Sequence, residues 1–298
     1  MRLIRIVLCI LPLFISLFAE DTVRCFPDCT RQVARSGLFK SKATAYAILV
    51  GCNYYGFERN PRSDSLRRAV SDVKKMMRVL RDNRYCVDTV LGTAATPAGV
   101  RSALSLVMHA AEAGDRVLFY FSGHGMLRDS LEKMLRPEEA RYLLGPEEEN
   151  KSFYLVLRQE LRDPVIRDVI ALGEIIDSLT SAAPVMQKVI IIDACFSGSG
   201  TRQVDAPFRR YHHLLDDNSF SMLMAWNGRI REGIYTKAIC KGLRGAADRN
   251  HDRKVDFNEL ARFVDRNVGS GFPRSSERTY RALSSFTGNG TLILTSNR

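Results

Sequence analysis

The 298-residue sequence lacks the short motifs of the common nucleotide-dependent enzymes and of one large hydrolase class. It has no G-x-x-x-x-G-K-[ST] phosphate loop and no G-x-G-x-x-G fingerprint, so the usual sequence evidence for nucleotide binding is missing. The absence of a G-x-S-x-G turn argues against a serine hydrolase built on a nucleophile elbow. Internal repeats and low-complexity segments are also absent. With 45% hydrophobic and 26% charged residues, the chain is neither largely disordered nor collagen-like.

A hydrophobic run long enough to cross a membrane is absent as well. The longest run, residues 6–18, follows two arginines and ends before Ala19, whereas a transmembrane helix needs about 20 apolar residues. This pattern predicts a signal peptide over residues 1–19, followed by a linker over 20–42. Leu17 fits the cleavage-site pattern poorly, so retention as an anchor is the alternative. We favour cleavage and expect a secreted or periplasmic protein.

Acidic residues are fewer than basic ones. The chain has 33 Asp and Glu against 44 Lys and Arg, a formal net charge of +11. Such a charge attracts anionic partners. The basic residues are scattered, however, and no nucleic-acid-binding motif accompanies them. We therefore expect no specific nucleic-acid partner, only weak and salt-sensitive binding.

The seven cysteines do not form an obvious disulfide framework. Cys25 and Cys29 lie close together before the predicted core and are the favoured disulfide pair. Cys52 and Cys86 lie at or beside apolar strand-like runs, where a buried free thiol is common. Any cysteine that serves as a nucleophile must stay reduced.

Apolar patterning predicts strands that alternate with helices. Short apolar runs indicate buried strands, and apolar residues at helical spacing indicate amphipathic helices. The expected strands are 45–51, 86–91, 116–121, 189–192, 219–225 and 291–295, and the expected helices are 66–80, 97–113, 172–179, 235–246 and 257–268. Residues 126–168 contain three prolines and are expected to form long loops. The alternation favours one α/β domain over 43–298, with a mostly parallel sheet of about six strands and helices on both faces.

Two of the expected strands are followed by residues suited to thiol chemistry. Ser122-Gly-His-Gly125 follows the third strand, and Asp193-Ala-Cys-Phe-Ser-Gly198 follows the fourth. Because the carboxyl ends of parallel strands share one edge of a sheet, His124 and Cys195 can face one another there. An imidazole that assists thiolate formation is the minimum for a cysteine nucleophile. Taken singly, the two residues have structural alternatives, a hydrogen-bonded histidine and an inert buried cysteine.

The order of these segments resembles that of the caspase-like cysteine peptidases, especially the metacaspases and bacterial caspase homologues. The likeness runs from about Ala45 to Thr295. The matching segments are Tyr46-Ala-Ile-Leu-Val-Gly-Cys-Asn-Tyr-Tyr55, Asp72, Gly114-Asp115, Phe121-Ser-Gly-His-Gly125, Asp193-Ala-Cys-Phe-Ser-Gly198 and Gly233-Ile-Tyr-Thr236. The resemblance implies a three-layer caspase-like sandwich and a peptidase that acts on polypeptides.

The resemblance also implies a role for each matching position. Cys195 would be the nucleophile and His124 its acid/base partner, with the backbone N–H groups of Gly125 and Cys195 as the oxyanion hole. Asp193 would line the pocket for the residue before the cut, the S1 pocket, and attract Arg or Lys. Capping of the following turn is the structural alternative for Asp193. Caspases proper have Gln-Ala-Cys where this chain has Asp-Ala-Cys, so we expect cleavage after Arg or Lys.

A segment near the C-terminus has the spacing of a calcium-binding EF-hand loop. Positions 1, 3, 5, 9 and 12 of that loop are Asp248, Asn250, Asp252, Asp256 and Glu259. The usual glycine at position 6 is replaced by Arg253, which must then adopt a conformation unfavourable for a side chain. The alternative is a loop closed by its own hydrogen bonds. Calcium is therefore a candidate ligand, while the peptidase chemistry itself requires no cofactor.

Other polar clusters carry weaker signals. Glu138-Glu139 and residues 147–149 are further acidic candidates for a metal, and His212-His213 beside Asp216-Asp217 could ligate zinc. Solvated loops are nevertheless the expected structure of all three clusters. Residues 200–218 are polar, and basic specificity predicts self-cleavage there after Arg202 or Arg210. The alternative to an active enzyme is a catalytically silent caspase-like module that binds peptides or partners. The presence of both His124 and Cys195 favours the enzyme.

Overall fold

The computed structural model describes residues 45–53, 66–145, 153–157, 168–181, 187–197, 220–224, 233–269, 284–285 and 293–296. The predicted signal peptide, linker and self-cleavage sites lie outside these residues, as do Cys25, Cys29, His212 and His213. Within the described ranges, no helix is both long and apolar enough to span a bilayer.

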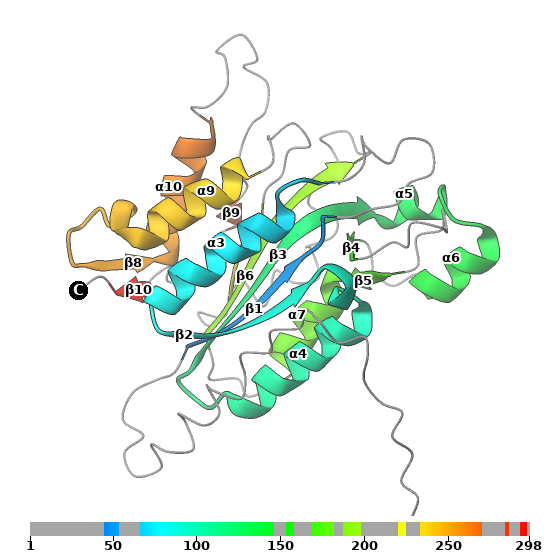
Figure 1. The fold of residues 1–298 in the computed structure, drawn as a ribbon, viewed down its shortest axis with the longest axis horizontal. Helices are drawn as coiled ribbons and strands as arrows, with labels where there is room; N and C mark the ends of the chain where they lie inside the picture. The colour runs from blue at the N-terminus through cyan, green and yellow to red at the C-terminus, as the bar shows by residue number, and fades with distance from the viewer. Residues whose placement is uncertain are drawn as a thin grey trace, which may run out of the picture.

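Among the described residues, eight strands form one sheet, which lies at the centre of the molecule (Figure 1). Its main path runs through β2 (Tyr85–Leu91), β1 (Ala45–Gly51), β3 (Arg116–Leu127), β6 (Gln187–Ser197), β7 (Phe220–Met224) and β9 (Ser284–Ser285). The pairings from β2 to β7 are parallel, and β9 is antiparallel. Two antiparallel strands, β4 (Phe153–Val156) and β5 (Val169–Ala171), extend the sheet. β4 pairs with the C-terminal part of β3, from His124 to Leu127. The sequence pattern thus predicted the parallel core but missed β4 and β5.

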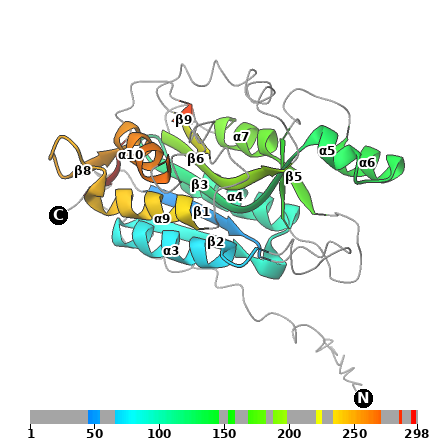
Figure 2. The same cartoon turned by 90° about the horizontal axis from the view of Figure 1, so that it is seen from above.

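Helices cover both faces of this sheet, as Figure 2 shows from above. Ala47 and Leu49 of β1 pack on the face covered by α3 (Ala69–Asp82), α9 (Ile234–Lys241) and α10 (Phe257–Gly269). Ile48 and Val50 pack on the other face, with α4 (Pro97–Ala110) and α7 (Leu172–Thr180). All four side chains are fully buried, which explains why β1 is a continuous apolar run rather than an alternating one. The predicted three-layer α/β sandwich is confirmed.

Local signals start the helices close to where the sequence predicted them. Thr96 caps α4 by accepting the N–H of Gly99 on its hydroxyl oxygen at 3.1 Å, and Pro97 occupies the first helical position. The helix ends at Ala110, before the predicted stop at Gly114. Short turns, η1 (Gly92–Ala94) and η4 (Gly242–Ala246), precede α4 and follow α9.

The charged stretch after β3 is not the run of loops that its composition predicted. This stretch contains α5 (Arg128–Glu132), α6 (Pro137–Leu144) and β4. Buried residues of these three elements and of β5 form a third hydrophobic cluster. The buried guanidinium of Arg128 donates to the carbonyl oxygens of Leu144 at 3.2 Å and Gly145 at 2.7 Å. The charged side chain of Arg128 therefore links α5 to the end of α6. A search for apolar periodicity does not detect such a contact.

Glu138 and Glu139 do not lie in a solvated loop as expected. They form the first turn of α6, whose first residue is Pro137. The Glu139 carboxylate accepts the backbone N–H of Arg136 at 3.0 Å, so it caps the helix.

The last predicted strand exists but belongs to a separate sheet. β10 (Ile293–Ser296) pairs antiparallel with β8 (Lys254–Asp256) in a two-stranded sheet beside α10, not with the central sheet. The expectation that residues 291–295 complete the main sheet was wrong, because β8 was not recognised as a partner.

Candidate active site

The two predicted catalytic positions are direct neighbours in the sheet. β3 and β6 pair in parallel over eleven consecutive positions, from Arg116 and Gln187 onward. His124 stands opposite Cys195 in this ladder. Neighbouring strands lie about 4.8 Å apart, so side chains at paired positions are within reach of one another. The His124 side chain is partly buried, and the Cys195 side chain lies outside the described atoms.

Both motifs lie inside strands rather than after them. β3 was expected to end at residue 121 and β6 at residue 192, but they continue to Leu127 and Ser197. β1 pairs with β3 only as far as Ser122. Beyond that point β4 takes the place of β1, and His124 stands opposite Val156. His124 is therefore held between two strands, which fixes its backbone more firmly than a loop would.

Gly125 is required by the closeness of β4. A Cβ atom at this position would lie 2.4 Å from Cζ of Phe153 and 3.2 Å from Cβ of Ala194. Both neighbours are buried, so neither can move aside cheaply. Packing of the strand therefore requires a glycine at this position, whether or not its N–H has the oxyanion-hole role that the resemblance implies.

Asp193, the predicted S1 carboxylate, lies in β6 opposite Ser122 and is partly exposed. Its Oδ2 accepts a hydrogen bond from the Thr236 hydroxyl in the first turn of α9, at 2.5 Å. The Tyr120 hydroxyl lies 2.5 Å from the same Thr236 oxygen. Thr236 and Tyr120 are fully buried. The sequence flagged the segment that ends at Thr236 without giving the hydroxyl a role, and it did not single out Tyr120.

A second carboxylate, Asp72 in α3, lies near the same cluster. It is buried and forms an ion pair with Lys75 at 2.8 Å. Gly233, which precedes α9, has a φ of 79° and packs so closely that a Cβ there would lie 3.1 and 3.2 Å from the Asp72 oxygens. Asp72 is one of the positions that carry the caspase-like resemblance, but the resemblance implied no role for it.

The electrostatics show that both carboxylates act on one buried region. Burial is the main reason that the pKa of Tyr120 lies well above its usual range, and the charges of Asp193 and Asp72 raise it further. Burial likewise raises the pKa of the Cys240 thiol to about 11; the charges of Arg244 and Lys75 lower it, and those of Asp72 and Asp193 raise it. Both carboxylates therefore act on the region between β3, β6, α3 and α9, where basic side chains partly offset their charge.

One cysteine prediction was right and one was wrong. Cys52 is buried and forms no disulfide, as expected, and the same holds for Cys240. Cys86, expected to be free, is disulfide-bonded. Because neither Cys52 nor Cys240 is disulfide-bonded, neither of them is its partner. Spacing along the sequence does not reveal such connectivity.

The strand register shows that Cys195 is not the partner of Cys86. Cys86 of β2 stands level with Lys188 of β6, three strands away, and Cys195 lies seven residues further along β6. That separation is about 14 Å across the strands and about 23 Å along them, whereas the Cα atoms of a disulfide lie within about 7 Å. The disulfide therefore does not involve the predicted nucleophile.

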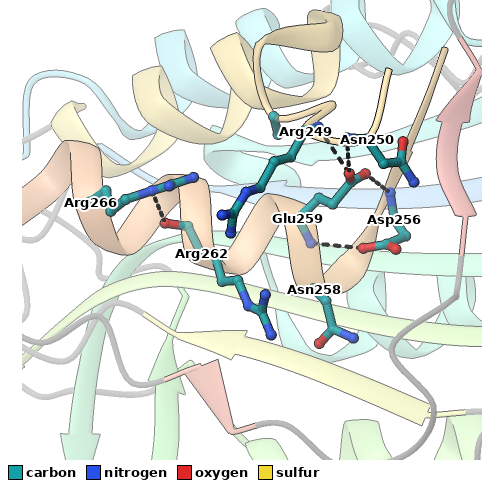
Figure 3. A pocket seen from close by; sticks show the side chains of 8 residues that line it. Arg249, Asn250, Asp256, Asn258, Glu259, Arg262 and Arg266 are labelled. Atoms are coloured by element: carbon teal, nitrogen blue, oxygen red, sulfur yellow. Dashed lines mark hydrogen bonds between the residues drawn. The ribbon is translucent and has the colours of Figure 1, made fainter. Parts of the chain in front are cut away.

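The predicted calcium loop is closed largely by its own backbone (Figure 3). Glu259, at position 12, accepts the N–H groups of Arg249 at 2.9 Å and Asp256 at 3.2 Å. Asp256 in turn accepts the N–H of Glu259 at 2.7 Å, which makes a reciprocal cap at the start of α10. Asp248 accepts the N–H of Arg253 at 3.0 Å, and Arg253 has the predicted left-handed φ of 64°.

A test of the loop against a bound cation gives a mixed result. The other oxygen of Asp248 is buried and has no hydrogen-bond partner within the described part of the chain, as a metal ligand would. Each oxygen of Glu259 already accepts a backbone N–H, however. Among the described residues, no group of three or more His, Cys, Asp or Glu is arranged to hold a metal. These contacts are compatible with the self-closed alternative, and calcium binding at this loop stays a prediction.

A pocket of about 400 Å³ adjoins this loop and is lined by Arg249, Arg262 and Arg266 as well as by the loop carboxylates (Figure 3). None of the predicted catalytic residues lines it. It is thus separate from the paired positions on β3 and β6.

The fold is an α/β sandwich in which a histidine and a cysteine occupy paired positions on adjacent parallel strands. The family model for the caspase domain matches residues 44–288, and the chain belongs to this caspase-like peptidase family. No curated protein sequence matches the chain. Among solved structures it is similar to protein GSU0716 from Geobacter sulfurreducens, at 15% identity and a TM-score of 0.48, over 78% of this chain and 90% of that one.

Proposed function

We propose that this member of the caspase-domain family is an active cysteine endopeptidase that uses a Cys195–His124 dyad. The observation that supports this most directly is the pairing of positions 124 and 195 on adjacent strands. In this mechanism the Cys195 thiolate attacks the substrate carbonyl, and the N–H groups of Gly125 and Cys195 stabilise the oxyanion. His124 protonates the leaving amine and then activates the water that hydrolyses the thioester.

We infer that the enzyme cleaves after Arg or Lys. Asp193 is a partly exposed carboxylate two residues before the nucleophile. Its charge favours a guanidinium or ammonium group in the S1 pocket through a charge-assisted hydrogen bond. Asp72 adds negative charge nearby, although its ion pair with Lys75 offsets part of it. The resemblance to metacaspases, rather than to caspases proper, agrees with this choice.

The remaining parts of the proposal concern export, processing and metal dependence. The N-terminal segment is proposed to direct export, and the disulfide at Cys86 is consistent with an oxidising compartment. Self-cleavage is proposed after Arg202 or Arg210. The chemistry is proposed to need no metal, because a thiolate and an imidazole supply both the nucleophile and the proton transfers.

The test is hydrolysis of fluorogenic peptides that carry Arg, Lys or Asp before the reporter group. The expected result is turnover of the Arg and Lys peptides, none of the Asp peptide, and no turnover by Cys195→Ala or His124→Ala. Parallel assays with calcium and with a chelator decide the metal question, and mass spectrometry of wild type against Cys195→Ala decides self-cleavage. A folded wild type that cleaves none of the peptides would instead support a silent peptide-binding module.

A further inference from the structure

The hydrogen bonds around Asp193 form a continuous buried chain. Thr236 has only one hydroxyl hydrogen, and it donates this to the Asp193 carboxylate, which can only accept. The hydrogen in the contact between Tyr120 and Thr236 must therefore come from Tyr120. Tyr120 is in turn hydrogen-bonded to the side chain of Ser122. The chain thus runs Ser122–Tyr120–Thr236–Asp193.

This chain connects the two catalytic motifs from the side of the helices. Ser122 lies two residues before His124 in β3, and Asp193 lies two residues before Cys195 in β6. Thr236, from α9, joins them at a point where Thr236 and Tyr120 are both fully buried. Hydrogen bonds in a buried region of low dielectric constant strengthen one another, and those with a charged acceptor or donor are the strongest.

We propose that Thr236 and Tyr120 are positioning residues that hold the Asp193 carboxylate ready for an Arg or Lys side chain. This rests on the proposed function. Fixing one oxygen of Asp193 through Thr236 sets the plane of the carboxylate, which a guanidinium needs for paired hydrogen bonds. An unsupported carboxylate would lose part of that alignment on each encounter with substrate. Specificity for basic residues is therefore set by a helix that carries no catalytic group.

The protein supplies matched controls for this proposal. Tyr235, next to Thr236, is fully buried, and its hydroxyl has no hydrogen-bond partner in the described part of the structure. The hydroxyl of Thr295 in β10 is likewise buried and unpartnered among the described residues. Tyr235→Phe and Thr295→Val therefore delete the same groups as Tyr120→Phe and Thr236→Val without removing a hydrogen bond of the chain. Because the charge of Asp193 helps to raise the pKa of Tyr235, Tyr235→Phe also tests whether the loss of any hydroxyl near Asp193 is enough.

The experiment measures KM and kcat for the Arg peptide in these variants and in Thr236→Ser. Thr236→Val should raise KM about ten-fold, as loss of a hydrogen bond to a charged group predicts, and change kcat less than about two-fold, because the contact acts on binding. Tyr120→Phe should raise KM about three-fold, since it removes only the outer hydrogen bond. Thr236→Ser should restore KM, and both control variants should match wild type.

A second measurement separates this proposal from the proposed peptidase activity. Binding of agmatine, which is arginine without its carboxyl group, is measured by calorimetry on Cys195→Ala protein with and without Thr236→Val. Weaker agmatine binding in the double variant supports the positioning role even if wild type hydrolyses nothing. The proposal is overturned if Thr236→Val matches wild type, if the controls lose as much as it does, if kcat falls while KM stays constant, or if agmatine does not bind.

Discussion

Replacement of Gly125 by alanine tests how tightly the histidine motif is fitted to β4. The new Cβ would lie 2.4 Å from Cζ and 3.0 Å from Cε2 of the Phe153 ring, and 3.2 Å from Cβ of Ala194. Phe153 is only 2% exposed, so its ring has no free space to enter. Overpacking of a core lowers the free energy of unfolding by about 1–3 kcal/mol, and for a contact this short we expect a loss of about 3 kcal/mol. Urea unfolding should show that loss in the free energy of unfolding, together with a loss of peptidase activity.

The matched variant for this experiment changes the neighbour. Leucine lacks the ring atoms that the new Cβ would strike, so Gly125→Ala combined with Phe153→Leu should recover about 1 kcal/mol relative to the sum of the two single changes. The reasoning is refuted if Gly125→Ala alone costs less than about 0.5 kcal/mol, the ordinary range of a harmless substitution. It is also refuted if the double variant shows no recovery.

Three further predictions concern stability. Gly233→Ala should lower the stability of the protein by about 1–2 kcal/mol, because Gly233 has a left-handed φ of 79°. The loss should exceed that of Gly114→Ala, where φ is a similar 87° but a Cβ would meet nothing within 4 Å. Equal losses in urea unfolding would argue against a close contact between residue 233 and Asp72. The Cys240 thiol has its pKa raised to about 11 by burial, so the stability that this group contributes is complete below the pKa of the unfolded thiol and is lost as the pH rises toward 11. Wild type should therefore lose about 1–2 kcal/mol more than Cys240→Ala between pH 8 and pH 10, and parallel curves would contradict this. Cys86→Ser should lower stability by about 2–4 kcal/mol in oxidising buffer and not at all in reductant, and peptide mapping of unreduced protein should join Cys86 to a cysteine other than Cys195.

The sequence predicted those parts of the fold that depend on uninterrupted apolar runs. β1 and the first half of β3 were found because, after the first residue of each strand, their side chains are buried between two helical layers. The second half of β3 was missed because Ser122, Gly123 and His124 have no strand-like composition. Their conformation is imposed by β4 and β6 on either side, which is a tertiary effect that composition does not report.

The strand register brings the predicted residues His124 and Cys195 to paired positions, but the sequence did not predict the hydroxyl contact at Asp193. His124, Cys195 and Asp193 were identified from short motifs next to strands. Thr236 lies 43 residues after Asp193, and only the packing of α9 on β6 and α3 brings the two together. A contact of that kind leaves no periodic signal in one sequence. The family resemblance includes the segment that ends at Thr236, but it does not indicate the contact with Asp193.

The position of Thr236 has a consequence for any nicked form of the protein. A cut after Arg202 or Arg210 would fall between β6 and β7, so His124 and Cys195 would stay on one polypeptide while Thr236 went with the other. The severed halves would have to remain associated, through the β6–β7 ladder and the buried hydroxyl contact, for basic side chains still to be selected. Dissociation of the nicked halves would remove β7, α9 and α10 from the core together with Thr236, so a nicked form that stays active must keep its two chains together.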